Sequence, residues 1–211
     1  MKINEIFKSI QGESTYMGQP CVFIRATACN LRCSWCDTPY SFHEGIEMSL
    51  DEIQGKVEDY RCKLVEVTGG EPLLQPEVYP LITSLLDRGH DVLIETSGSL
   101  PINRLDPRAH VIMDIKCPAS GMSRAMCWGN IDDLRKKDEV KFVLMDYNDY
   151  LFAKNICTEL NLHQRCPVLF SPVFGELSPR SLAEWILQDS LPVRLQIQLH
   201  KYIWDPTLRG V

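Results

Sequence analysis

The chain has 211 residues, of which 45% are hydrophobic and 24% are charged, as in ordinary globular proteins. The net charge of −6 does not suggest a nucleic-acid binder, and no apolar run approaches the ~20 residues of a membrane helix. The first residues also lack the apolar stretch of a signal peptide. We therefore expect one cytoplasmic domain over residues 1–211 that binds neither nucleic acid nor membranes.

Short apolar, β-branched runs recur along the chain and predict seven strands that are buried on both faces. Amphipathic segments between several of these runs predict helices at 49–60, 76–89, 149–162 and 179–189. Repeated βα units imply a parallel sheet with right-handed crossovers, which can curl into an incomplete barrel or stay open. The predicted strands are Val22–Thr27, Leu64–Thr68, Val92–Thr96, Val111–Ile115, Val140–Leu144, Val168–Ser171 and Leu195–Leu199.

Several residues predict where the helices begin and end. Ser49 and Glu52 have the spacing of a capping box at the start of the first helix. Pro76 suits the first turn of the second helix, and Gly89 follows its end. The residues expected to open the two later helices are Asn148, and Ser178 with Pro179.

Polar residues follow the ends of six predicted strands. In parallel α/β folds, ligands lie outside the carboxyl ends of the strands. We therefore expect these residues to converge on one mouth. They are Cys29, Thr68–Pro72, Glu95–Gly98, Asp114–Lys116, Ser171–Pro172 and His200–Lys201.

Three of the nine cysteines, Cys29, Cys33 and Cys36, stand within eight residues, with no fourth nearby. Three thiolates can hold three corners of a [4Fe–4S] cluster and leave one iron free to bind a substrate or cofactor. Two other interpretations are a zinc site with His43 as fourth ligand and simple packing of buried thiols. We do not expect Cys117 to ligate the cluster, because a fourth thiolate would occupy the free iron. Nine cysteines without an export signal suit a reducing compartment.

The cysteine spacing, with Trp35 before the last cysteine, resembles the signature of the radical S-adenosylmethionine (SAM) enzymes. Gly69-Gly70-Glu71-Pro72 resembles the motif with which that family binds the SAM amino group, where Glu71 supplies negative charge. The resemblance implies an α/β fold, a partial (incomplete) parallel β/α barrel with its cluster loop at 29–36. It also implies that SAM binds the free iron and that one electron cleaves it to methionine and a 5′-deoxyadenosyl radical. The further cofactor-binding residues implied are Ser97, Lys116 and Ser120.

The opening Phe7–Ser14 resembles the FxSIQGEG opening of the 7-carboxy-7-deazaguanine synthases, with Ser14 in place of the usual glycine. Arg25 in a Phe-Ile-Arg run, Asp37-Thr38 and the ending at 200–211 are similar too, so the resemblance covers nearly the whole chain. It implies ring contraction of 6-carboxy-5,6,7,8-tetrahydropterin to 7-carboxy-7-deazaguanine with loss of ammonia, a step of queuosine and deazapurine biosynthesis.

The same resemblance implies roles for the remaining site residues. Thr38 is expected to bind Mg²⁺ together with the substrate carboxylate, and the segment at about 200–211 to cap the substrate. A homodimer and an electron donor such as flavodoxin are also implied. An amide, a carboxylate and a guanidinium suit a heterocycle that carries a carboxylate. The expected substrate-binding residues are Gln11, Glu13, Arg25, Thr68 and His200.

Two alternative functions stay open at this point. An activating enzyme that makes a glycyl radical on a partner protein shares the cluster but does not need Gln11, Glu13 or Thr38. A non-catalytic zinc or iron–sulfur binding module uses the cysteines alone. Iron content and colour separate the zinc module from the other two.

Overall fold

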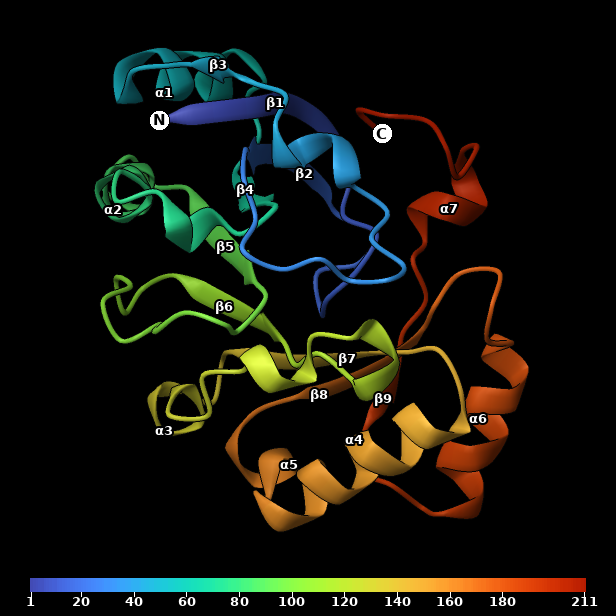
Figure 1. Cartoon of the computed structure of the whole chain (residues 1–211). Coiled ribbons are helices and arrows are strands. Elements are labelled where there is room, and N and C mark those ends of the chain that lie inside the picture. The colour runs from blue at the N-terminus through green and yellow to red at the C-terminus, as the bar shows by residue number, and fades with distance from the viewer.

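The computed structural model describes all residues from 1 to 211, and one nine-stranded sheet organises the whole chain (Figure 1). The strand order is β3-β1-β2-β4-β5-β6-β7-β8-β9. The two edge strands, β3 and β9, do not pair with each other, so the sheet stays open as the predicted incomplete barrel requires. The strands are β1 (Lys2–Ile10), β2 (Pro20–Ala26), β3 (Ile46–Glu47), β4 (Leu64–Gly69), β5 (Asp91–Thr96), β6 (His110–Asp114), β7 (Glu139–Leu144), β8 (Val168–Pro172) and β9 (Arg194–Leu195).

Parallel pairing runs from β2 through β4 to β9, which confirms the predicted βα architecture for most of the sheet. The first strand, β1, is a correction: it was not among the predicted strands, and it pairs antiparallel with both β2 and β3. Its apolar residues Ile3, Ile6, Phe7 and Ile10 have the 3–4 spacing of a helix. A β-bulge between Ile3 and Glu5 shifts the register and explains how this spacing fits a strand.

The last strand is shorter than predicted. Pairing with β8 ends at Leu195, after which Gln196 N–H donates to the carbonyl of Phe170 at 2.9 Å. Pro172 closes β8 and has no N–H to continue a ladder. The chain from 196 to 199 instead leaves the sheet and runs toward the opposite end of the open barrel, where α7 lies near β1 and β2 (Figure 1).

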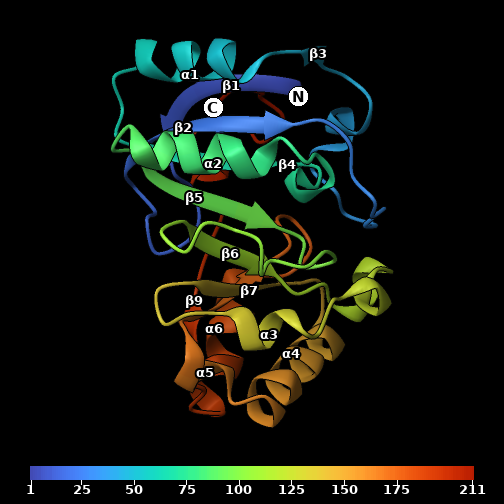
Figure 2. The same ribbon diagram turned by 90° about the vertical axis from the view of Figure 1, so that its left-hand side faces the viewer.

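The longer helices lie on the outer face of the sheet; in Figure 2, α2 lies in front of the strands and α1 lies above β1. None of the helices has the length and apolarity needed to cross a membrane. The α-helices are α1 (Leu50–Asp59), α2 (Val78–Asp87), α3 (Asn130–Asp133), α4 (Tyr147–Glu159), α5 (Leu162–Arg165), α6 (Pro179–Gln188) and α7 (His200–Ile203). Short 3₁₀ helices are η1 (Pro39–Phe42), η2 (Pro72–Leu74), η3 (Pro118–Ser120) and η4 (Ser123–Ala125).

The predicted capping box is present at α1, where Ser49 N–H donates to Glu52 at 2.7 Å and Glu52 N–H donates to Ser49 Oγ at 3.2 Å. Gly89 follows α2 with φ +89, as expected of a residue that ends a helix. However, α2 begins at Val78, two residues after Pro76.

The start of α4 is also a correction. Its cap is Asp146, whose carboxylate accepts from Asp149 N–H at 2.9 Å, so Asn148 lies inside the helix. Asp146 places a negative charge at the positive end of the helix, which Asn148 cannot do. At α6, Pro179 takes the first position as predicted, while Ser178 makes no side-chain capping bond.

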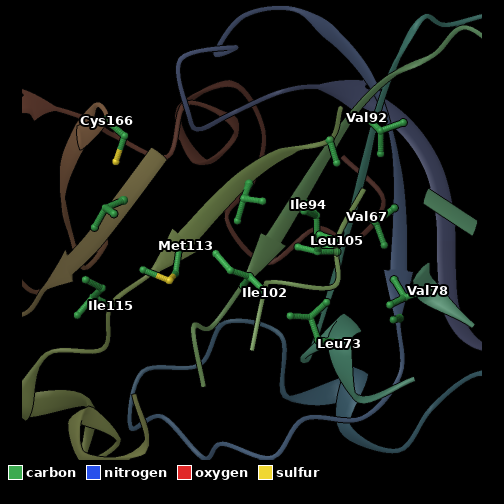
Figure 3. Close-up of a cluster of buried hydrophobic side chains, with 14 of the residues drawn as sticks. Val67, Leu73, Val78, Val92, Ile94, Ile102, Leu105, Met113, Ile115 and Cys166 are labelled. Atoms are coloured by element: carbon green, nitrogen blue, oxygen red, sulfur yellow. The ribbon is translucent and has the colours of Figure 1, made fainter. Parts of the chain in front are cut away.

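Alternation along the strands divides the buried residues into an outer and an inner set. Residues such as Val67, Ile94 and Met113 point to the helices and form the main core (Figure 3). The inner face is apolar only toward one end, where a small cluster gathers. Its buried members are Cys21, Phe23, Leu64, Leu93 and Ile112. Further along the same inner faces, charged residues replace apolar ones, and these residues line the site.

Candidate active site

A cavity of about 410 Å³ lies at the carboxyl ends of the parallel strands, a size suited to small-molecule ligands. It is lined by polar residues from the ends of β2, β4, β5 and β6 and by α7, as expected from their places along the chain. Ser171 and Pro172 do not line it, and Val173 and Phe174 stand there instead. The cavity wall contains every residue expected to bind a metal or substrate: Cys29, Cys33, Cys36, Thr38, Gln11, Glu13, Arg25, Thr68 and His200.

The three clustered cysteines are free thiols at one side of this cavity, and each is partly exposed. Burial raises the pKa of the Cys29 and Cys33 thiols above their ordinary value. No three His, Cys, Asp or Glu side chains lie close enough together to hold a single metal ion. Zinc needs its thiolates within ~2.3 Å of one point, whereas a [4Fe–4S] cluster attaches each thiolate to a different iron. The three thiols that line the cavity can each bind a different iron of such a cluster.

His43 and Cys117, the two residues considered as a fourth metal ligand, lie outside the cavity lining. His43 is exposed and does not line the cavity. Cys117 is buried outside the cavity lining, where its thiol is directed at the Ile115 carbonyl at 3.9 Å. The cavity therefore presents three thiols and no fourth.

Gly69 and Gly70 bring the end of β4 against the chain that enters the cluster loop. A Cβ on Gly69, whose φ is +144, would lie 2.3 Å from the Ala26 carbonyl oxygen. A Cβ on Gly70 would lie 2.1 Å from the Ala28 carbonyl oxygen and 2.8 Å from Cys29 Cβ. Both positions therefore require glycine, and the reason is close packing on the segment that carries Cys29.

Glu71 does not line the cavity, although its two glycine neighbours do. Its carboxylate is fully buried and accepts from Ser97 N–H at 2.7 Å, Ser97 Oγ at 2.5 Å and Leu73 N–H at 3.0 Å. Thr96 Oγ1 donates to it as well, at 2.9 Å. These protein donors occupy the carboxylate that was expected to face the SAM amino group. The Glu71 carboxylate therefore fixes the position of Ser97, and Ser97 lines the cavity.

Ser120 also lies outside the cavity lining. Its hydroxyl donates to the Cys117 carbonyl at 2.5 Å, and its own carbonyl accepts from Ser34 N–H at 3.1 Å. Ser34 Oγ adds a bond to the Ala119 carbonyl at 2.9 Å. Ser120 therefore anchors the middle of the cluster loop through η3 and makes no contact of its own with the cavity.

Comparison with known proteins agrees with this geometry. The Radical SAM superfamily model matches residues 23–114. The chain is 48% identical over 214 residues to the 7-carboxy-7-deazaguanine synthase of Chlorobaculum tepidum, covering 100% of this chain and 97% of that protein. It is 45% identical to the synthase of Koribacter versatilis, with 100% of both chains covered. The chain belongs to the 7-carboxy-7-deazaguanine synthase family.

The fold of this family member also matches a solved structure. QueE from Escherichia coli superposes with a TM-score of 0.79 at 23% sequence identity, and the match covers 94% of each chain. Membership in the radical SAM superfamily implies a [4Fe–4S] cluster and SAM as cofactors. The three cavity thiols, and the absence of a fourth beside them, suit that cofactor pair.

Four charged residues of the strands also line the cavity; Glu95 and Asp114 were expected at the mouth from their places at strand ends, whereas Glu66 and Lys141 were not predicted. Each interrupts an apolar strand, where an unpaired charge is costly. That interruption is the signal by which they can be found in the sequence. They are Glu66 on β4, Glu95 on β5, Asp114 on β6 and Lys141 on β7.

These charges are paired with opposite charges. Lys141 Nζ contacts Glu13 Oε2 at 2.7 Å and also contacts Glu95. Lys116 Nζ contacts Asp114 Oδ2 at 2.7 Å. Burial lowers the pKa of Lys141 and of Lys116, but the neighbouring carboxylates raise both above the ordinary value, so both lysines stay charged.

Glu66 differs from its neighbours because no cation contacts it. Burial, Glu95 and Glu13 raise the pKa of Glu66 well above its ordinary value. Gln11 Nε2 donates to Glu66, while Gln11 Oε1 accepts from Glu13 N–H at 3.0 Å. The amide of Gln11 is therefore oriented by the protein on both sides, which leaves one N–H for a ligand.

The other wall of the cavity carries cations and α7. Arg25 Nε donates to Glu5 at 2.8 Å, and its terminal guanidinium nitrogens make no protein hydrogen bond. His200 packs against Gly12, where a Cβ would lie 2.1 Å from His200 Nδ1. Gly12 also accepts from Leu199 N–H at 2.9 Å, so the opening segment and the C-terminal segment close the cavity together.

Proposed function

We propose that this chain converts 6-carboxy-5,6,7,8-tetrahydropterin to 7-carboxy-7-deazaguanine with loss of ammonia, as a radical SAM enzyme. One observation carries the proposal: the cluster thiols share a single cavity with the residues from Gln11 to Glu13. An activating enzyme must admit a protein segment, whereas this cavity is sized for a small molecule and partly covered by α7. Near-complete coverage of two synthases supports the same conclusion.

The cofactors fit the residues on one side of the cavity. Cys29, Cys33 and Cys36 would hold the cluster, and Gly69, Gly70, Ser97 and Lys116 line the space beside it. When bound, the cluster and SAM supply the radical chemistry that starts the rearrangement. The protein's own part is to hold Ser97 through Glu71 and to keep Lys116 charged beside Asp114. A positive lysine there can balance a carboxylate of the cofactor.

The substrate fits the opposite side. The free terminal nitrogens of Arg25 can grip a carboxylate in two parallel hydrogen bonds. Glu13 and Gln11 offer acceptors and one remaining N–H to the edge of a pterin ring. Thr68 donates to Glu95 at 2.9 Å, which fixes its hydroxyl at the cavity wall. His200 and the rest of the C-terminal segment would cover the bound substrate.

Mg²⁺ at Thr38 is part of the same proposal. Thr38 lines the cavity, with its hydroxyl 3.9 Å from Cys36 Sγ. Asp37 is the stronger ligand by chemistry, but Lys201 holds it at 3.0 Å and Gln198 at 3.3 Å. Mg²⁺ keeps several waters and needs few protein ligands, so the Thr38 hydroxyl and substrate oxygens suffice. The ion would orient the substrate carboxylate.

The proposal also includes the oligomeric state, the location and the electron donor of the enzyme. We infer a homodimer that works in the cytoplasm and takes electrons from a donor such as flavodoxin. An oxygen-sensitive cluster needs the reducing conditions that keep thiols free, and all nine cysteines are free in the structure.

The test is an anaerobic reconstitution with iron and sulfide, followed by SAM, reductant, Mg²⁺ and the pterin, with mass analysis of the product. The expected product is the deazapurine carboxylate, and Thr38→Ala should lose most of its response to added Mg²⁺. Thr83→Ala, a substitution on helix α2 away from the cavity, is the matched control. An intact cluster that cleaves SAM yet leaves the pterin unchanged would contradict the proposal.

A further inference from the structure

Lys141 is a buried cation that no sequence motif explains. It lies on β7 between Val140 and Phe142, which belong to the outer core, so its side chain is on the inner face. Only 4% of the residue is exposed, and it lines the cavity. A lysine this deep is costly unless carboxylates compensate its charge.

The carboxylates that compensate the charge of Lys141 come from segments far apart in the sequence. Lys141 Nζ lies 2.7 Å from Glu13 Oε2, on the loop after β1, and in direct contact with Glu95 on β5. Asp114 Oδ2 on β6 is 4.0 Å away. One ammonium group thus joins two carboxylates that both reach into the cavity.

Without that cation, these carboxylates form a crowded group of like charges. Two buried carboxylates that share a site do not both ionise, and one takes up a proton. Gln198 Nε2, 3.0 Å from Glu13, is neutral and cannot offset the repulsion. The titratable and charged groups that face Lys141 or its two partners are Glu13, Glu66, Glu95, Asp114, Lys116 and His200.

We propose that Lys141 is a positioning residue that bridges Glu13 and Glu95, offsets the repulsion between these two carboxylates and aims both at one edge of the substrate heterocycle. The inference rests on the proposed function, since the heterocycle is the pterin. Two ionised carboxylates accept N–H donors from a ring, whereas a carboxylate pair that shares a proton offers one acceptor fewer. Lys141 itself makes no bond to the reacting atoms.

The test compares Lys141→Met and Lys141→Arg with Lys136→Met, an exposed lysine outside the cavity that undergoes the same chemical change. Pterin turnover is measured anaerobically from about pH 6 to pH 9, with kcat and KM separated. We expect Lys141→Met to raise the pterin KM about tenfold or more at pH 7, since one charge-assisted acceptor is lost. Its kcat/KM should climb with pH as the shared proton leaves, while Lys141→Arg and Lys136→Met keep the wild-type profile.

A purely structural role would lower the thermal stability of Lys141→Met and leave its pH profile unchanged, which overturns the inference. If Lys141→Met does not fold, the double variant Lys141→Met/Glu95→Gln is tested instead, because it removes one positive and one negative charge. The double variant should show a raised pterin KM and a kcat/KM that does not change with pH. A wild-type pterin KM in the double variant overturns the inference. Failure of wild type and Lys136→Met to convert the pterin overturns the proposed function instead, and this inference with it.

Discussion

Gly12 offers a sharp test of how the C-terminal segment closes the cavity. A Cβ at this position would lie 2.1 Å from His200 Nδ1, 2.9 Å from His200 Cγ and 3.0 Å from the His200 backbone nitrogen. Rotation of the imidazole about χ2 relieves the Nδ1 contact and a change of χ1 moves Cγ, but the backbone nitrogen of His200 moves only with α7. Gly12→Ala must therefore push α7 outward and strain the bond from Leu199 N–H to the Gly12 carbonyl, now 2.9 Å long.

The expected cost follows from these contacts. Overpacking at a tight contact costs about 1–3 kcal/mol, and a weakened hydrogen bond adds about 1 kcal/mol. Docking of the C-terminal segment should therefore weaken by about 2–4 kcal/mol, or about 30-fold to 1,000-fold in its closing equilibrium. Local opening of this size exposes a segment to proteolysis without global unfolding.

The assay is limited proteolysis of the C-terminal segment, with pterin KM measured on the same preparations. Gly55→Ala is the matched control, because Gly55 lies inside α1 and a Cβ there meets nothing within 4 Å. That substitution should raise the free energy of unfolding by about 0.5–1 kcal/mol through helix propensity. Wild-type protease resistance and KM in Gly12→Ala would refute the reasoning.

Three further predictions concern single residues. The pKa of Glu66 is higher in the folded protein than its ordinary value of 4.5. The stabilising effect of Glu66 is therefore complete below pH 4.5 and is lost as the pH rises through the folded-state pKa. In urea titrations, Glu66→Gln should therefore gain stability over wild type as the pH rises above 4.5, by at most about 1.4 kcal/mol per pH unit, and a constant difference would contradict this. Glu71→Ala leaves the buried donors of Ser97 unpaired and should lower the free energy of unfolding by about 3 kcal/mol or more in urea denaturation; a loss under 1 kcal/mol would show that water replaces the carboxylate. Cys29→Ser should abolish the iron-dependent visible absorption after anaerobic reconstitution, whereas Cys127→Ser should keep it.

Most of the sheet was predictable because its strands are continuous apolar runs, as buried parallel strands must be. The capping box of α1 and the glycine that ends α2 were predictable for a related reason: each depends on residues adjacent in sequence. The first strand was not predictable from periodicity, because its β-bulge gives the apolar residues a helical spacing. Asp146 displaced Asn148 as the cap of α4 because a carboxylate also complements the helix dipole.

The residues of the site were predictable on the same basis, according to whether the residues involved are close in sequence. The placement of the three thiols and of Thr68 at one mouth follows from strand ends, which the sequence marks with polar residues. The partners of Glu71 do not follow, because Ser97 lies 26 residues away and local spacing cannot reveal that the carboxylate is already occupied. Lys141 was missed for the same reason, since its contact with Glu13 spans 128 residues. Pairings of this kind form only once strands that are distant in sequence assemble into the sheet.

The measurement that tests the central claim most directly is electron paramagnetic resonance of the reduced, anaerobically reconstituted protein, recorded before and after SAM is added. Three cysteine ligands leave one iron of the cluster open to the cofactor, so we predict about four irons per chain and a signal that shifts when SAM binds. A signal that SAM leaves unchanged, or protein that retains no iron, would contradict the claim.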